Sequence, residues 1–264
     1  MKTALTIAGS DPSGGAGLQA DLKTFAAHGV YGMSAITSVT SQNTLGVTGV
    51  FDIPTEVVKT QLDAIFTDIF PNSVKIGMLS SSEIINAIAD KLIEYNVKNI
   101  VLDTVMVSTS GHNLLRPDAV DALTSRLFPL ADIITPNLYE AQILCGFEIH
   151  TQAEMVSAAE YIYNKYKTNL LIKGGHLSYT SSDLLYNGDA LWFEGKHIDN
   201  PNTHGTGCTL SSAIAANLAL GFDIRSSVKN SKKYIRGAIS DMLNLGGGRG
   251  PLNHMYQFFS NKTK

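Results

Sequence analysis

Residues 200–221, NPNTHGTGCTLSSAIAANLALG, place Gly205, Thr206, Gly207 and Cys208 directly before a run rich in alanine and leucine. Such a run predicts a helix, and the first turn of a helix offers unpaired backbone N–H groups and the positive end of the helix dipole. Glycines let that backbone approach an anion closely. We therefore expect an anion site here, and a Cys208 with a lowered pKa that acts as a base or nucleophile. The alternative is a glycine turn before a packing helix, with Cys208 as a small buried residue.

Further polar residues stand at or just after the ends of predicted strands. They are Gly9 to Asp11, Asp103, Asn137 and Lys173. Because ligands of open α/β sheets bind at the carboxyl ends of the strands, we expect these residues to meet at one site.

These residue types suggest a site for phosphates and a metal ion. Asp103 and Glu140 could hold Mg²⁺ directly or through water, since Mg²⁺ needs only one or two carboxylates together with phosphate oxygens. Lys173 could contact a nucleotide phosphate. Asp11 could accept hydrogen bonds from a substrate. Each of the three carboxylates could instead cap a turn or a helix.

Several common motifs are missing from the chain. There is no G-x-x-x-x-G-K-[ST] sequence, and no G-x-G-x-x-G follows a strand. The seven histidines are scattered without metal-ligand spacing, which makes a structural zinc site improbable. Cys145 lies in an apolar stretch, where packing in the core is the expected role.

The composition predicts one domain over residues 1–264, with 44% hydrophobic and 16% charged residues. A formal net charge of -3 argues against a nucleic-acid surface. The apolar run near the N-terminus is shorter than the roughly 7–15 residues of a signal peptide core. Nor does any stretch approach the roughly 20 residues of a membrane span. We therefore expect a cytoplasmic protein without a structural disulfide.

The apolar pattern alternates between short strands and helices. Strands are expected at 3–9, 33–40, 74–78, 99–103, 131–137 and 169–175, and helices at 16–28, 55–69, about 85–92, 155–166, from 206 onward and 224–242. This alternation predicts a largely parallel sheet covered by helices. Asn187-Gly188 predicts the turn of a hairpin after the last of these strands.

The motifs together resemble a known family. ALTIAGSDPSGGAGLQADLKTF, SQNTLGV, KIGML, VLDTVMV, ITPNLYEA, IKGGH and NTHGTGCTLSSAIA stand in order along nearly the whole chain. The chain in this respect resembles the hydroxymethylpyrimidine and phosphomethylpyrimidine kinases of thiamine biosynthesis, in the ribokinase-like superfamily. The resemblance implies a three-layer α/β/α fold, usually a homodimer. It also implies transfer of the γ-phosphoryl group of ATP to a hydroxymethylpyrimidine or its monophosphate.

The resemblance also implies roles for individual residues. Gly205, Thr206 and Gly207 match the family's anion hole, and Cys208 matches its cysteine base. The residues that match the pyrimidine pocket are Gly9, Asp11, Gln42, Met78 and Val105. Those that match the nucleotide, Mg²⁺ and phosphate region are Asp103, Asn137, Glu140, Lys173, Thr203 and Lys232. Whether Lys232 or its neighbour Lys233 faces the phosphates stays open.

Three alternatives accompany this interpretation. Some relatives with the same anion hole act mainly on pyridoxal, although Gln42 favours the pyrimidine because those relatives tend to lack it. A non-catalytic binding protein on the same fold would be expected to have lost part of the anion hole, yet Gly205, Gly207 and Cys208 are all present. Sugar and nucleoside kinases of the superfamily commonly carry an aspartate where this chain has Cys208.

Overall fold

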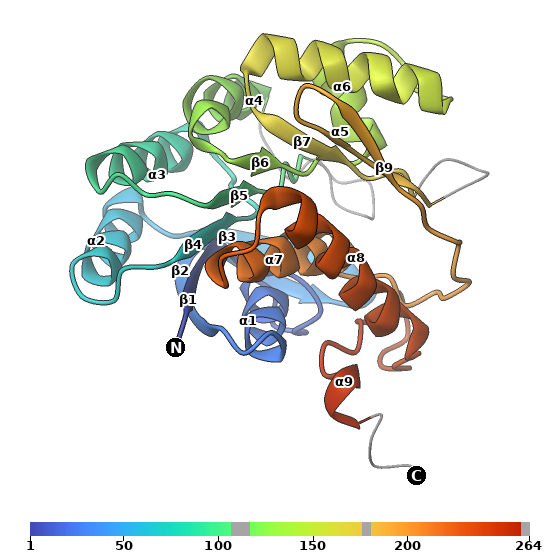
Figure 1. The fold of residues 1–264 in the computed structure, drawn as a ribbon. Helices are drawn as coiled ribbons and strands as arrows, with labels where there is room; N and C mark the ends of the chain where they lie inside the picture. The colour runs from blue at the N-terminus through green and yellow to red at the C-terminus, as the bar shows by residue number, and fades with distance from the viewer. Residues whose placement is uncertain (107–116, 176–180, 260–264) are drawn as a thin grey trace.

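The computed structural model describes residues 1–106, 117–175 and 181–259. Val107 and His176, which end two of the motifs above, lie outside these ranges, as does His112. Within them the chain forms a nine-stranded sheet in the order β3-β2-β1-β4-β5-β6-β7-β8-β9 (Figure 1). The strands are β1 (Thr3–Ser10), β2 (Tyr31–Asn43), β3 (Gly46–Asp52), β4 (Ser73–Ile76), β5 (Ile100–Leu102), β6 (Ile133–Ile134), β7 (Asn169–Ile172), β8 (Asp183–Tyr186) and β9 (Ala190–Phe193).

The centre of the sheet is parallel, from β2 through β1, β4, β5 and β6 to β7. The edge strands β3 and β9, and β8 beside β9, are antiparallel to their neighbours. Central strands such as β1 and β4 are buried on both faces, so burial does not alternate along their residues. The carboxyl ends of the parallel strands therefore meet at one edge of the sheet.

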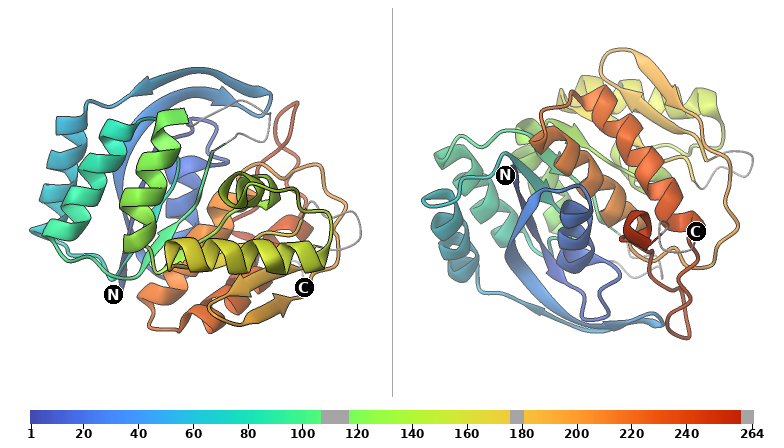
Figure 2. Two further views of the ribbon diagram at one scale, coloured as in Figure 1. Left: turned by 90° about the horizontal axis from the view of Figure 1, so that it is seen from above. Right: turned by 60° about the horizontal axis from the view of Figure 1, so that its bottom comes forward.

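Helices cover both faces of the sheet (Figures 1 and 2). On one face lie α1 (Gly17–Ala27), α7 (Thr206–Ala219) and α8 (Ile224–Ser240), and on the other α2 (Thr55–Phe66), α3 (Ser82–Glu94), α4 (Pro117–Ala122), α5 (Leu138–Cys145) and α6 (Gln152–Tyr166). A short helix, α9 (Tyr256–Phe259), contacts α8. Separate clusters of buried apolar side chains fill the two spaces between sheet and helices. The three-layer α/β/α fold with a mostly parallel sheet is confirmed.

Element boundaries differ from the prediction in a few places. Residues 131–137 contain only the two-residue β6 and a separate bridge from Asn137 to Lys173, because Pro136 lacks the N–H that would continue the ladder. The hairpin of β8 and β9 turns at the expected Asn187-Gly188. Strand β3 and the helices α4 and α9 were not predicted. The residues of β3 are largely exposed, so no buried pattern marks them.

Two expectations about membrane spans and Cys145 can be compared with the structure. No helix in the described residues is long and apolar enough to cross a membrane. Cys145 is buried in the core as expected. The division into a single domain over residues 1–264 stays a prediction.

Candidate active site

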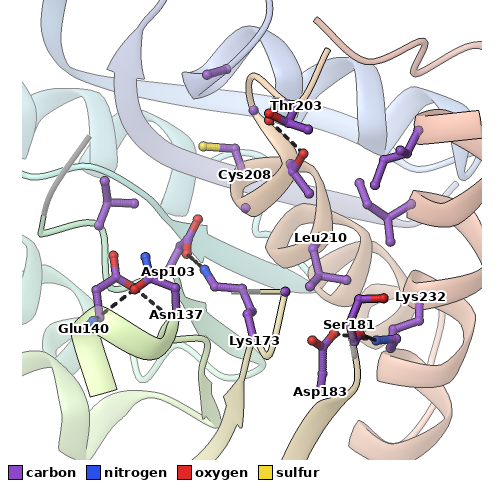
Figure 3. A pocket seen from close by; sticks show the side chains of 18 of the residues that line it. Asp103, Asn137, Glu140, Lys173, Ser181, Asp183, Thr203, Cys208, Leu210 and Lys232 are labelled. Carbon is purple, nitrogen blue, oxygen red and sulfur yellow. Dashed lines mark hydrogen bonds and ion pairs between the residues drawn. The ribbon is translucent and has the colours of Figure 1, made fainter. Parts of the chain in front are cut away.

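A cavity of about 2040 Å³ opens at the carboxyl edge of the parallel strands. Every site residue predicted from the sequence lines it. These residues come from distant parts of the chain: the end of β1, the end of β2, the segments after β4, β5 and β6, the end of β7, and the starts of α5 and α7 together with α8 (Figure 3). The fold therefore gathers into one cavity residues as far apart in the sequence as Gly9 and Lys232.

The start of α7 presents backbone donors to this cavity. Gly205 has φ 81, and a Cβ there would lie 1.8 Å from the carbonyl oxygen of Gly15, so only glycine fits. Thr206 N–H donates to the carbonyl of Thr203, and the hydroxyl of Thr206 donates to the same oxygen at 2.8 Å. The N–H groups of the next two residues, in the first turn, are left for a ligand.

The position of Gly207 shows which side chains lie close to a ligand bound at this turn. A Cβ on Gly207 would lie 3.5 Å from Lys173 Nζ and 3.7 Å from Asp103 Oδ2, so this backbone faces an ammonium and a carboxylate across the cavity. An anion bound at the first turn of α7 would be held between the helix N-terminus and Lys173.

The predicted lowering of the Cys208 pKa is wrong. The pKa of the thiol is raised to about 11, mainly by burial and also by the Asp21 and Asp103 carboxylates. Lys75 and a hydrogen bond from the Gly17 backbone lower it, but only in part. The helix N-terminus alone suggested a thiolate, whereas neither the extent to which the thiol is buried nor the carboxylates nearby could be read from the sequence. Cys208 is therefore mainly a thiol at neutral pH in the unliganded protein.

Lys173 and Asp103 form an ion pair at the cavity wall. Lys173 Nζ lies 3.0 Å from Asp103 Oδ1, and the hydroxyl of Thr135 donates to the same oxygen at 3.2 Å. Burial opposes the charge on Asp103, but Lys173 and Lys75 hold its pKa below the ordinary value. Burial also opposes the charge on Lys173, whose pKa is nevertheless raised by Asp103 and Glu140.

Asn137 and Glu140 form the N-terminal capping box of α5. Glu140 N–H donates to Asn137 Oδ1 at 2.9 Å, and Asn137 N–H donates to Glu140 Oε2 at 2.8 Å. Thr104 and the Met106 backbone also donate to the Glu140 carboxylate. Burial raises the pKa of Glu140. The capping role that the sequence left open for Glu140 is confirmed, and the same carboxylate lines the cavity.

The opposite end of the cavity holds Asp11, Gln42 and a histidine that the site prediction missed. Burial would raise the pKa of Asp11, but hydrogen bonds from His204, Ser13 and the backbone lower it to about 2. His204 Nε2 lies 2.9 Å from Asp11 Oδ2 and 3.3 Å from Gln42 Nε2. The signal in the sequence that could have identified His204 is its place directly before Gly205.

Lys232 lies apart from Cys208, beyond Leu210 (Figure 3). Its Nζ is 2.7 Å from Asp183 Oδ2 and donates to the Ser181 carbonyl at 3.2 Å. Lys233 lines the same cavity. A role of Lys232 at the phosphates stays a prediction.

Comparison with known proteins gives consistent results. A family model described as phosphomethylpyrimidine kinase matches residues 11–253. A hydroxymethylpyrimidine/phosphomethylpyrimidine kinase of Rhizobium meliloti is 51% identical over 97% of this chain and 98% of its own.

Solved structures of two kinds of kinase are also similar. The phosphomethylpyrimidine kinase of Clostridium difficile is 48% identical, with a TM-score of 0.82 over 90% of this chain and 100% of its own. An ADP complex of Bacillus subtilis pyridoxal kinase is 39% identical, with a TM-score of 0.90 over 98% of this chain and 99% of its own.

Proposed function

This chain belongs to the phosphomethylpyrimidine kinase family, and from that premise we propose that it transfers the γ-phosphoryl group of ATP to 4-amino-5-hydroxymethyl-2-methylpyrimidine and then to its monophosphate, in thiamine biosynthesis. The observation that carries the proposal is the start of α7. There Cys208 and free backbone donors face Lys173 and Asp103 across one cavity. The resemblance to the family implies that the cysteine at this position is the base.

We place the transferring phosphoryl group at the first turn of α7. In phosphoryl transfer the protein mainly positions the reactants and neutralises charge on the transferring group. The N–H groups of Gly207 and Cys208 and the ammonium of Lys173 can do both, because they are fixed before the substrates arrive. Removing one such fixed donor typically lowers kcat by roughly 10²–10³-fold.

Cys208 would take the proton of the substrate alcohol. Because its pKa is about 11, the thiolate is a minor form at neutral pH and becomes more abundant as pH rises. In a loose transition state the alcohol oxygen needs little negative charge before the phosphoryl group arrives, so a small thiolate fraction can support turnover. Cys208→Ser should lower kcat by about 10²-fold or more while leaving the KM for ATP nearly unchanged. Cys145→Ser is the matched control, since Cys145 packs in the core.

The pyrimidine would bind between the end of β1 and the segment after β4. Gly9 and Met78 line this part of the cavity, with Gln42 nearby. The Gln42 amide can both donate and accept, which suits the edge of an aminopyrimidine. Met78 gives an adaptable apolar contact to a ring.

The residues at the other end fit Mg²⁺. Asp103 and Glu140 supply oxygen donors, which this hard cation prefers. The Glu140 oxygens already accept hydrogen bonds from Asn137, Thr104 and Met106, so Glu140 fits a contact through water better than direct ligation. A bound Mg²⁺ would neutralise charge on the ATP phosphates. Asn137, Thr203 and Lys232 are proposed to contact the nucleotide.

We also propose a homodimer. Leu45, Val50 and Phe51, at and beside the edge strand β3, are largely exposed and apolar, which favours pairing with a second copy. Light scattering on the purified protein tests this. Location in the cytoplasm stays a prediction.

The test of the function is release of ADP with Mg-ATP and hydroxymethylpyrimidine, its monophosphate or pyridoxal at equal concentrations. Turnover of both pyrimidines, well above pyridoxal, supports the proposed two-step kinase. Preference for pyridoxal would contradict it, and would place the enzyme in vitamin B6 salvage with the same fold and site.

A further inference from the structure

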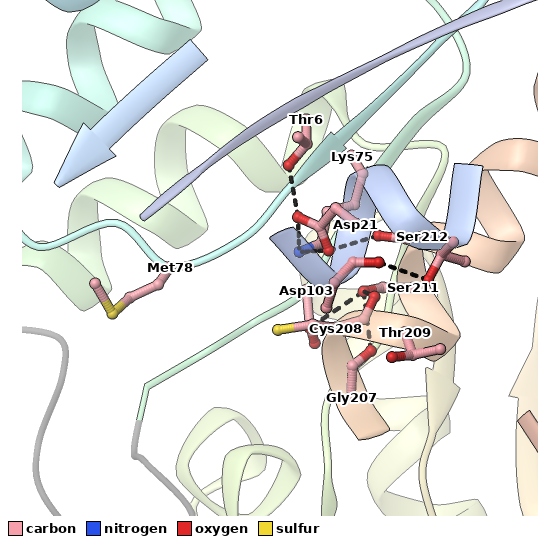
Figure 4. Close-up of polar contacts among 12 residues, drawn as sticks. Thr6, Asp21, Lys75, Met78, Asp103, Gly207, Cys208, Thr209, Ser211 and Ser212 are labelled. Carbon is pink, nitrogen blue, oxygen red and sulfur yellow. Dashed lines mark hydrogen bonds and ion pairs between the residues drawn. The ribbon is translucent and has the colours of Figure 1, made fainter. Parts of the chain in front are cut away.

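A second aspartate–lysine pair lies beneath the start of α7. Lys75 Nζ is 2.9 Å from both Oδ1 and Oδ2 of Asp21, and both side chains are fully buried (Figure 4). Lys75 comes from β4 and Asp21 from α1. Neither side chain lines the cavity. The pair therefore cannot contact a substrate directly.

Two hydroxyl groups hold the Asp21 carboxylate in place. Thr6 Oγ1 donates to Oδ2 at 2.6 Å, and Ser212 Oγ donates to Oδ1 at 2.6 Å. Ser212 follows Cys208 by four residues in α7, so the two side chains lie on the same side of the helix, one turn apart. The same hydrogen bonds that fix the ion pair thus also fix the turn of α7 that carries Cys208.

Four charged side chains from four segments act on the sulfur of Cys208. They are Asp21 on α1, Lys75 on β4, Asp103 after β5 and Lys173 after β7. The Lys75 ammonium acts on the thiol more strongly than the Asp21 carboxylate does, and with the opposite sign. The pair therefore has a net effect at Cys208 that favours the negatively charged sulfur.

Stability alone does not account for an ion pair at this depth. Well-packed apolar residues of similar volume commonly stabilise a fold as well as a buried ion pair does. A lysine whose carboxylate partner is hydrogen-bonded to α7 one turn from Cys208 is better explained by what its charge does there.

We propose that Lys75 is a positioning residue for the reaction of Cys208: Asp21, Thr6 and Ser212 hold its ammonium fixed beneath α7, where it stabilises the cysteine anion that receives the alcohol proton. The proposal rests on the role of Cys208 in the proposed function and deepens it. A neutral side chain in place of Lys75 should make the anion rarer even where the fold is intact.

The test measures alkylation of Cys208 by iodoacetamide, followed at the Cys208 peptide by mass spectrometry from pH 7 to 10. The decisive variant is the double substitution Lys75→Met with Asp21→Asn, which leaves no unpaired buried charge. Its alkylation at pH 8 should be severalfold slower than in the unmodified protein, because the ammonium outweighs the carboxylate. Lys75→Met alone should slow alkylation by about tenfold, which corresponds to one unit of pKa. Asp21→Asn should accelerate it.

A merely structural role predicts a different pattern. Loosening of α7 would expose the thiol and accelerate alkylation in all three variants. Equal or faster alkylation in the double variant overturns the proposal, whether or not the single variants fold. Lys91→Met and Asp63→Asn, which break the ion pair between α3 and α2 (2.7 Å), are matched controls that should leave alkylation unchanged.

Turnover gives a second and independent result. In the double variant kcat should fall severalfold at pH 8 and recover toward higher pH, with little change in the KM for ATP. If alkylation slows as expected but kcat does not follow, the effect of Lys75 on the thiol stands and the role of Cys208 as base is wrong. Alkylation therefore separates failure of this inference from failure of the proposed function.

Discussion

Two aspartate–lysine pairs flank the first turns of α7, and they differ in their access to the cavity. Lys173 and Asp103 are 3.0 Å apart, and the Lys173 side chain is 17% exposed at the cavity wall. Lys75 and Asp21 are 2.9 Å apart, and both side chains are 0% exposed. The same kind of ion pair thus occurs once at the cavity wall, where a ligand can reach it, and once in the core, where no ligand can.

Consecutive serines of α7 connect both pairs to the helix. Ser211 Oγ donates to Asp103 Oδ2 at 3.2 Å, and Ser212 Oγ donates to Asp21 Oδ1 at 2.6 Å. In the Lys173–Asp103 pair at the cavity wall, Lys173 can exchange the Asp103 carboxylate for a phosphate, because Lys173 lines the ligand site. In the Lys75–Asp21 pair, here called the sealed pair because both side chains are fully buried, the ammonium is a fixed charge. The comparison teaches that burial, rather than the residue types, separates a ligand-binding lysine from a positioning one.

Lys75→Met should show the largest effect on stability. It leaves Asp21 charged and unpaired in the core, which costs about 3–5 kcal/mol of unfolding free energy. The double substitution with Asp21→Asn should recover most of this loss. Urea denaturation of both variants measures the difference. A loss below about 1 kcal/mol in the single variant would mean that the sealed pair is not isolated from solvent.

Lys173→Met should lower kcat strongly but the unfolding free energy less than Lys75→Met does. We expect kcat to fall roughly 10²–10³-fold, because a fixed positive charge at the transferring phosphoryl group is lost. The unfolding free energy should fall by less than in Lys75→Met, because water from the cavity can replace the 17% exposed Lys173 side chain beside the buried Asp103 carboxylate. Steady-state kinetics and denaturation on the same preparation test this. Equal losses of stability in Lys173→Met and Lys75→Met would remove the contrast between the pairs.

Gln42→Leu should have the smallest effect on catalysis of the three substitutions, because Gln42 lies away from both ion pairs. Loss of a hydrogen bond to the pyrimidine should lower kcat/KM for hydroxymethylpyrimidine by about tenfold, with a smaller change for pyridoxal. Competition between the two substrates measures the ratio. An equal loss for both would show that Gln42 does not select the pyrimidine.

Much of this site was predictable from the sequence. The glycines before α7, the polar residues at strand ends and the family motifs all pointed to one cavity, because parallel strands bring their carboxyl ends together. The part that the sequence does not indicate is the buried ion pair of Lys75 and Asp21. Lys75 lies in β4, at the start of the KIGML motif, and Asp21 lies in α1; nothing local in the sequence indicates that they meet. The error in the Cys208 pKa has a related cause, since burial of the thiol, which is the largest factor, and the charges around the sulfur both depend on distant segments.

The most direct test of the account is the pH dependence of kcat/KM for hydroxymethylpyrimidine with Mg-ATP between pH 7 and 9. The Cys208 pKa is about 11, so the thiolate fraction rises about tenfold per pH unit across this range. The account predicts a rise of kcat/KM in parallel with that fraction, and its loss in Cys208→Ser. A flat profile in the unmodified enzyme, or the same rise in Cys208→Ser, would contradict the assignment of Cys208 as the base.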